Sequence, residues 1–205
     1  MVNKKILVRR LAEAYPNPKT ELQFSGEYQL VCSVLLSAQC TDKKVNETTP
    51  ELFRRFPDFA ALAKAKLPSL EQIIRPINYY KSKAKHLVGM AQMVQGEFAG
   101  KLPKTHAELI RLPGVGRKTA NVVMGELGHA PAFPVDTHVF RVSKRLGLAQ
   151  GKNPEEVEKE LCSKFDPKLW RNLHHWLILH GRRICQARNP KCSECTLRAS
   201  CPKNF

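Results

Sequence analysis

The sequence predicts an all-α protein of about ten helices, for three reasons. Apolar residues recur at helical spacing along nearly the whole 205-residue chain. Prolines or helix-capping side chains stand before most of these segments. No stretch alternates apolar and polar residues as a half-buried strand does, and no repeat interrupts the pattern.

In the first half of the chain, prolines and short polar loops separate the periodic segments. The segment 27–38 is apolar nearly all round, which predicts a helix in the core. Asp42 opens the next segment, and a proline precedes each of the two short segments after it. We expect helices over residues 6–14, 27–38, 42–56, 57–65, 68–74 and 80–98.

The second half has clearer start signals. Thr105 and Glu108 have the spacing of a capping box. Asn153 precedes Pro154, which places an N-cap before a proline at the first helical position. Residues 128–134 break the helical pattern. We expect helices over residues 105–112, 136–146, 153–165 and 170–180, and one more that carries Lys118 in its first turn.

The charge indicates a polyanionic partner. The formal charge is +16, from 34 Lys and Arg against 18 Asp and Glu, and nucleic acid is the commonest partner of such a chain. A membrane surface is the alternative, but no stretch approaches about 20 uninterrupted apolar residues. Arg9 and Arg10 also interrupt any signal-peptide core. We expect a soluble cytoplasmic protein without a targeting segment.

The stretch LPGVGRKTANVV, residues 112–123, combines a turn with a lysine. Pro113, Gly114 and Gly116 predict a tight turn, and the two glycines leave room for another backbone to approach. Lys118 follows at the start of a helix. A turn of this kind suits a phosphodiester, held beside a reactive amine. The alternative is an ordinary loop–helix junction with a surface lysine.

The seven cysteines are unevenly distributed along the chain. Four of them form a Cys-x6-Cys-x2-Cys-x5-Cys pattern, namely Cys185, Cys192, Cys195 and Cys201. An odd total with this clustering argues for a metal site in a reducing compartment rather than a disulfide framework. Both zinc and a [4Fe–4S] cluster accept four thiolates. The single CxxC pair with long, unequal flanks favours the larger cluster over zinc.

Lys118 is the candidate nucleophile. Its amine must be neutral to attack carbon, and both Arg117 and a helix N-terminus disfavour the ammonium form. Such an amine can form a Schiff base with a sugar carbon. Asp136 heads a new helix and is the candidate carboxylate that stabilises a cationic sugar and moves the lysine proton. The alternative role of Asp136 is only to cap that helix.

Several motifs, in this order, resemble the endonuclease III family of helix-hairpin-helix DNA glycosylases and AP lyases. They are LSAQ-x-TD from residue 36, Y-x-SKA from residue 80, LPGVGRKTANVV from residue 112, VDTHVFRV from residue 135, HHWLILHGR from residue 174, and the cysteine pattern. Each motif alone has moderate specificity, whereas the ordered set is highly specific. The resemblance covers roughly residues 20–202.

The resemblance implies a two-lobed architecture with a DNA-binding cleft. Residues 20–131 would form a six-helix barrel domain with the helix-hairpin-helix, and residues 1–19 and 132–205 a discontinuous helical domain with the iron–sulfur loop 185–201. It further implies excision of oxidised pyrimidines in base excision repair. Lys118 would be the Schiff-base nucleophile and Asp136 its partner, with β-elimination 3′ to the abasic site. The four clustered cysteines would hold a [4Fe–4S] cluster.

The resemblance also assigns contacts to double-stranded DNA that contains damaged bases or abasic sites. The expected contact residues are Gln39, Tyr79, Leu112, Gly114, Val115, Gly116 and Arg117; the basic cysteine loop adds Arg188 and Lys191. Gln39 would fill the gap left by a flipped base, and Tyr79 stands where a second wedge residue is commonly leucine. Ile110 replaces a glutamate found in some members, which predicts a slower enzyme.

Two other functions are consistent with parts of the sequence. An adenine-mismatch glycosylase usually lacks the lysine at position 118 and carries a long C-terminal domain, so the present chain fits it poorly. A non-catalytic DNA-binding protein with a structural metal would not need both Lys118 and Asp136. We expect a monomer that does not bind membranes and that associates with the nucleoid if the source is a prokaryote. Four histidines of the later helices are expected to be packed or hydrogen-bonded rather than metal ligands.

Overall fold

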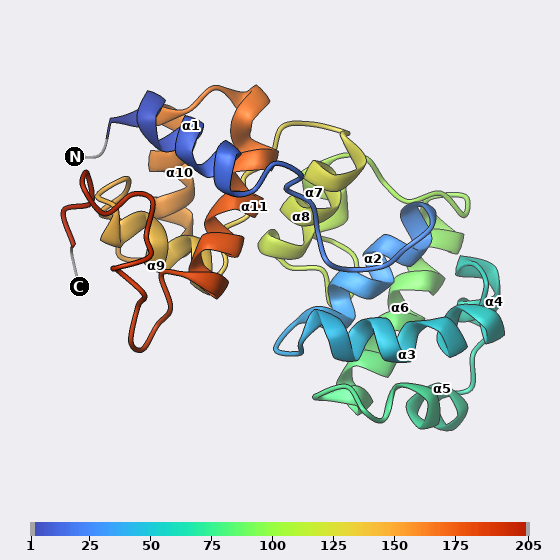
Figure 1. The fold of residues 1–205 in the computed structure, drawn as a ribbon. Coiled ribbons are helices and arrows are strands. Elements are labelled where there is room, and N and C mark those ends of the chain that lie inside the picture. Colours follow the sequence, from blue (N-terminus) through green and yellow to red (C-terminus); the bar gives the residue numbers. More distant parts are fainter. Residues whose placement is uncertain (1–2, 204–205) are drawn as a thin grey trace. The chain divides into compact units, whose positions relative to one another are not determined.

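A computed structural model describes residues 3–203, and over these residues the protein is all-α, as predicted (Figure 1). The helices are α1 (Lys4–Ala14), α2 (Gly26–Ser37), α3 (Asp42–Arg55), α4 (Phe59–Ala63), α5 (Leu67–Ile74), α6 (Tyr80–Glu97), α7 (His106–Leu109), α8 (Arg117–Leu127), α9 (Thr137–Arg145), α10 (Pro154–Lys164) and α11 (Pro167–Arg183). No helix of this described range is long and apolar enough to cross a membrane.

The described chain divides into two compact units. One unit spans residues 21–130 and contains α2 to α8. The other combines residues up to 20 with those from 131 onward, and so contains α1 and α9 to α11. An N-terminal helix thus completes a unit that is otherwise built from the C-terminal part of the chain.

The unit 21–130 is packed around α2 and α6. All residues of α2 from Leu30 to Leu36 are buried, so the prediction of a core helix is confirmed. This helix packs against α3, α6 and α8, while α6 also packs against α4 and α5. Each fully buried leucine or valine contributes roughly 1.5–3 kcal/mol of stability. The proposed DNA-binding residues of this unit therefore stand on a rigid base.

The other unit has its own core, formed where α11 packs against α9 and α1. Leu7 and Leu11 of α1 are fully buried in it, and the indole N–H of Trp176 donates to the carbonyl of Tyr15 at 3.0 Å. Three of the clustered cysteines pack against the same core: Cys185, Cys195 and Cys201. The cysteine loop is therefore continuous with the core of this unit.

Helix starts follow the capping signals, with small shifts. Asp42 is the first residue of α3, as predicted, and Thr41 caps the helix because its hydroxyl accepts from the Lys44 backbone N–H. The predicted cap Asn153 is confirmed, and Thr105 caps α7 as predicted. The largest difference is α11, which runs from Pro167 to Arg183 rather than over 170–180, since the Asp166 side chain caps it earlier.

Candidate functional site

The turn at residues 112–116 is anchored by its apolar residues and exposes its glycines. Leu112 and Val115 are buried, and the Val115 N–H donates to the Leu112 carbonyl at 3.0 Å. Gly114, between these two residues, and Gly116, directly after Val115, lie at the surface. The alternation explains how a hairpin can be held firmly and still present its backbone to a partner.

The two glycines have different physical roles. Gly114 has a φ of +79°, and a Cβ on it would lie 2.8 Å from the Cβ of His86 and 2.9 Å from Cδ1 of Leu35. Gly116 has a φ of −85°, which any residue adopts, and no atom lies within 4 Å of the place its Cβ would take. The prediction that Gly116 shapes the turn is therefore wrong. Its missing side chain leaves open space beside the backbone.

Lys118 is exposed and is the second residue of α8. Gly116 caps this helix without a side-chain acceptor. The first N–H groups of an α-helix lack acceptors within the helix, and the positive end of its dipole lies there too. Together with the adjacent Arg117, these groups make the start of α8 attractive to an anion such as phosphate.

Asp136 is half-buried and caps α9. Its Oδ1 accepts from the Val139 N–H at 2.8 Å, so the capping interpretation is confirmed. An ionised carboxylate can accept several further hydrogen bonds, and the cap leaves these free. Burial lowers the pKa of His138, two residues on, although the charge of Asp136 opposes that shift. Capping of α9 therefore does not prevent the Asp136 carboxylate from taking part in a reaction.

Gln39 and Tyr79 are 40 positions apart in the sequence, but the structure brings their loops together. Both residues have left-handed backbones, with φ of +53° and +60°. The Asn78 side chain donates to the Gln39 carbonyl at 2.6 Å. The Tyr79 ring is 66% exposed, which is unusual for an aromatic residue of this size. An exposed aromatic beside a strained polar residue is suited to contact with a ligand.

Lys83 supports this pair of loops, although the sequence indicated it only as part of a motif. Lys83 is 6% exposed, and its Nζ donates to the carbonyls of Leu36 at 2.8 Å and Ala38 at 2.6 Å. Burial lowers the pKa of this amine, an effect opposed by Cys40. Neither Asn78 nor Lys83 was predicted as a functional residue. The motif from residue 80 was the only available signal for Lys83.

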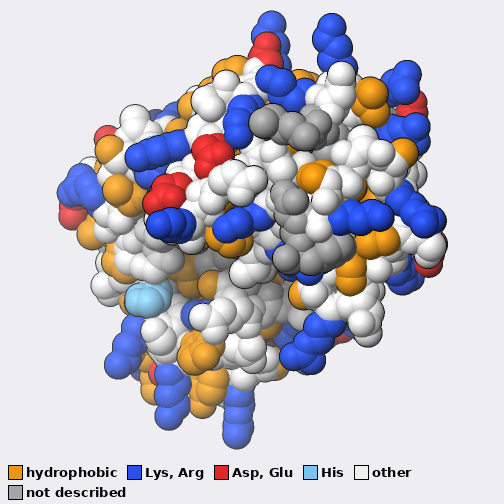
Figure 2. All heavy atoms as spheres, turned by 90° about the vertical axis from the view of Figure 1, so that its left-hand side faces the viewer, with side chains coloured by type: hydrophobic (Ala, Val, Ile, Leu, Met, Phe, Trp, Pro, Cys, Tyr) orange, Lys and Arg blue, Asp and Glu red, His pale blue; other side chains and the backbone are white. Residues whose placement is uncertain are grey.

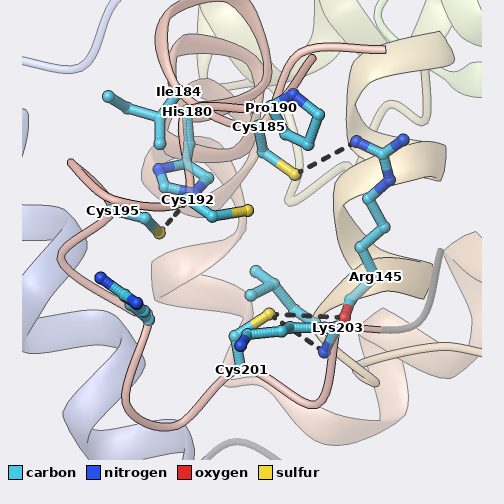
Figure 3. A pocket seen from close by; sticks show the side chains of 11 residues that line it. Arg145, His180, Ile184, Cys185, Pro190, Cys192, Cys195, Cys201 and Lys203 are labelled. Atoms are coloured by element: carbon cyan, nitrogen blue, oxygen red, sulfur yellow. Dashed lines mark hydrogen bonds between the residues drawn. The ribbon is translucent and has the colours of Figure 1, made fainter. Parts of the chain in front are cut away.

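The four clustered cysteines line one cavity, as Figure 3 shows, together with His180, Arg145 and apolar residues such as Ile184. All seven cysteines of the chain are free thiols. Within residues 3–203, no three Cys, His, Asp or Glu side chains are grouped so as to hold one metal ion. The four thiols therefore share one cavity.

Two arginines of α9 hold the cysteine loop. Arg145 donates to the carbonyls of Gln186 at 2.6 Å and Ala187 at 3.1 Å, and its guanidinium lies 3.7 Å from the Cys185 sulfur. Arg141 donates to the Cys185 carbonyl at 3.1 Å. Sequence reasoning missed both residues. Their hydrogen bonds fix the segment that carries the predicted DNA contacts.

The predicted contacts on this loop, Arg188 and Lys191, are exposed. Basic side chains are also common elsewhere on the molecule: Figure 2 shows one face on which Lys and Arg are more frequent than Asp and Glu. Such a surface raises the local concentration of a polyanion.

Three histidines of the later helices have hydrogen-bond partners, as predicted: His138 Nδ1 lies 3.3 Å from the Arg141 guanidinium, and His174 and His180 have the following contacts. His174 Nδ1 lies 2.9 Å from the Pro134 carbonyl. His180 lies between the Tyr15 hydroxyl at 3.4 Å and the Cys195 sulfur at 3.7 Å. Burial lowers the pKa of His180 to about 4, so its ring is neutral at pH 7.

Comparison with known proteins identifies the family. The family model described as "HhH-GPD superfamily base excision DNA repair protein" matches residues 32–167. Endonuclease III of Rickettsia felis is 45% identical over 186 residues, which cover 91% of this chain and 87% of the relative. Endonuclease III of Escherichia coli K12 is 41% identical over 195 residues, which cover 95% and 92%.

Solved structures agree with this result. A trapped endonuclease III–DNA covalent intermediate matches with a TM-score of 0.92 at 39% identity, over 99% of this chain and 97% of that chain. A non-covalent endonuclease III–DNA complex matches with a TM-score of 0.93 at 38% identity, with the same coverage. A thermostable thymine-DNA glycosylase, at 20% identity and a TM-score of 0.87, shares the fold. The chain belongs to the endonuclease III family of base-excision DNA repair proteins.

Proposed function

We propose that this protein is a bifunctional DNA glycosylase and AP lyase that removes oxidised pyrimidines from double-stranded DNA. The observation that carries the proposal is the hairpin-to-helix stretch of residues 112–123. It presents an exposed lysine, Lys118, two residues after Gly116, whose surroundings are open. An amine beside a phosphate-binding turn is the arrangement that Schiff-base chemistry on a DNA sugar requires.

In the proposed reaction, the Lys118 amine attacks the C1′ carbon of the damaged nucleotide. The bond between C1′ and the base breaks, and opening of the sugar gives an imine that links C1′ to Nζ. Loss of a proton from C2′ then expels the 3′ phosphate, so the strand is cut 3′ to the abasic site. Asp136 stabilises the cationic sugar and takes up the lysine proton.

The hairpin holds the DNA backbone for this step. The backbone N–H groups of Gly114 and Gly116 donate to phosphate oxygens, and the open surroundings of Gly116 let the phosphate come close. Gln39 and Tyr79 enter the duplex where the damaged base leaves it. Ile110, 46% exposed beside the hairpin, offers no carboxylate for proton transfer, which predicts slow turnover. A monomer is sufficient for these contacts, and binding to chromosomal DNA would place it at the nucleoid in the cytoplasm.

The four clustered cysteines are proposed to hold a [4Fe–4S] cluster. Their thiols line one cavity, and four cysteines supply one thiolate for each iron of a cubane. The cluster would supply a structural support for the loop that carries Arg188 and Lys191. A protein purified without oxygen should be yellow-brown with broad absorbance in the blue. A colourless protein loaded with zinc would contradict this assignment.

Borohydride trapping on abasic-site DNA tests the nucleophile. The wild type should form a covalent complex, and Lys118→Gln should abolish it, because the amide cannot form an imine. Lys101→Gln removes another exposed lysine of the same unit and should trap normally. Normal trapping by Lys118→Gln would exclude this lysine as the nucleophile. Excision of undamaged adenine from mismatches, without strand cleavage, would favour the adenine-mismatch activity instead.

A further inference from the structure

Two left-handed residues lie side by side in the unit 21–130, and neither is glycine. Gln39 follows the end of α2, and Tyr79 is the N-cap residue of α6, which it caps without a side-chain hydrogen bond. Left-handed backbones cost free energy in residues with a Cβ. They persist where surrounding contacts impose them, and they gather at ligand sites.

Lys83 joins the two loops. Its backbone N–H donates to the Tyr79 carbonyl at 3.0 Å, and its Nζ donates to the carbonyls of Leu36 and Ala38 at 2.8 and 2.6 Å. The carbonyls at a helix C-terminus lack partners within the helix and carry the negative end of its dipole. A buried ammonium group is therefore well placed to fix the end of α2.

Asn78 makes the second connection. Its side-chain amide donates to the Gln39 carbonyl at 2.6 Å, although the residue itself is exposed. It directly precedes Tyr79, so the bond ties the backbone of one strained residue to the neighbour of the other. With the two Lys83 bonds, three side-chain hydrogen bonds connect the segment 78–83 to the segment 36–39.

We propose that Lys83 and Asn78 are positioning residues that hold Gln39 and Tyr79 as one preformed wedge for the DNA duplex. The proposal rests on the proposed function, in which these two side chains occupy the space around the flipped nucleotide. In a preformed wedge, the free-energy cost of the two left-handed backbones arises during folding and not during DNA binding. Loosening either connection should therefore slow steps that need a filled duplex gap, and spare the chemistry at Lys118.

Single-turnover cleavage of an abasic site in a duplex, compared with the same site in a single strand, tests this. The single strand has no opposite base and no gap to fill. Lys83→Met and Asn78→Ala should each slow duplex cleavage about tenfold, the size of effect expected when a hydrogen bond that holds the wedge is lost. Single-strand cleavage should change less than about twofold. Tyr79→Ala, which removes the wedge ring itself, should show the same pattern.

The matched control is Lys85→Met, which removes an exposed lysine of the same helix, and it should keep the wild-type ratio. A second readout is 2-aminopurine placed opposite the abasic site, whose fluorescence should respond less to Lys83→Met and Asn78→Ala than to the wild type. Asn78→Asp keeps the size but cannot donate, and should resemble Asn78→Ala. Because Asn78 is exposed, its variants provide the test even if Lys83→Met unfolds.

Wild-type ratios in the Asn78 variants, with a slowed Tyr79→Ala, would overturn the proposal. A Tyr79→Ala protein with the wild-type ratio would overturn it as well, since no wedge would then exist. A wild-type protein that cleaves neither substrate would instead overturn the proposed function, so the two failures are distinguishable.

Discussion

The hairpin at residues 112–116 and the cysteine loop at residues 185–201 are both assigned to DNA contact, but they are held differently. The hairpin is fixed by apolar packing, with Leu112 and Val115 buried and Gly114 in tight contact with its surroundings. The cysteine loop has no helix. Arg145 donates hydrogen bonds to its backbone, and its four thiols line a cavity. The hairpin is therefore held by the core of its unit, whereas the cysteine loop is held by hydrogen bonds from α9 and, under the proposed function, by the cluster that its thiols bind.

The largest effect should come from a variant of the cysteine loop. Cys195→Ser removes one thiolate and should cost more than about 4 kcal/mol of stability, as loss of a bound metal centre does. Thermal unfolding and absorbance in the blue would measure this change. Cys162→Ser, outside the four-cysteine pattern, is the control and should keep the colour. An unchanged spectrum for Cys195→Ser would remove this cysteine from the ligand set.

Gly114→Ala should have the next largest effect, through the fold itself. The new Cβ meets His86 and Leu35 and must adopt a left-handed backbone, which together cost about 3 kcal/mol. Urea unfolding would measure the loss in the free protein, without DNA. A stability within experimental error of the wild type would contradict the tight packing of the hairpin.

Gly116→Ala should have the smallest effect on stability and a clear effect on DNA binding. Its backbone already suits alanine and the space is open, so the free energy of unfolding should change by less than about 1 kcal/mol. Affinity for abasic-site DNA should fall about tenfold, because the methyl group keeps the phosphate away from the hairpin amides. Fluorescence anisotropy at fixed salt would measure it. Unchanged affinity would show that no backbone approaches this glycine.

The comparison also shows what the sequence can and cannot predict. Helix positions followed from apolar spacing and caps, and the glycine turn and the cysteine pattern were visible because their residues are close in sequence. The supporting residues were not visible, because each contacts a residue far away in the sequence. Asn78 contacts a residue 39 positions earlier, Lys83 one 47 positions earlier, and Arg145 one 40 positions later. No local pattern encodes such contacts. The two roles of the hairpin glycines likewise required the neighbours of Gly114 to be known.

Helix α9 connects two of the features described above. Asp136 caps its first turn, and Arg145 at its last residue holds the cysteine loop. An α-helix of nine residues is about 13 Å long and bends little. The proposed catalytic carboxylate and the seat of the cysteine loop therefore belong to one stiff rod. A substitution in the cysteine loop that tilts α9 at Arg145 would therefore also displace the Asp136 carboxylate at the other end of the helix.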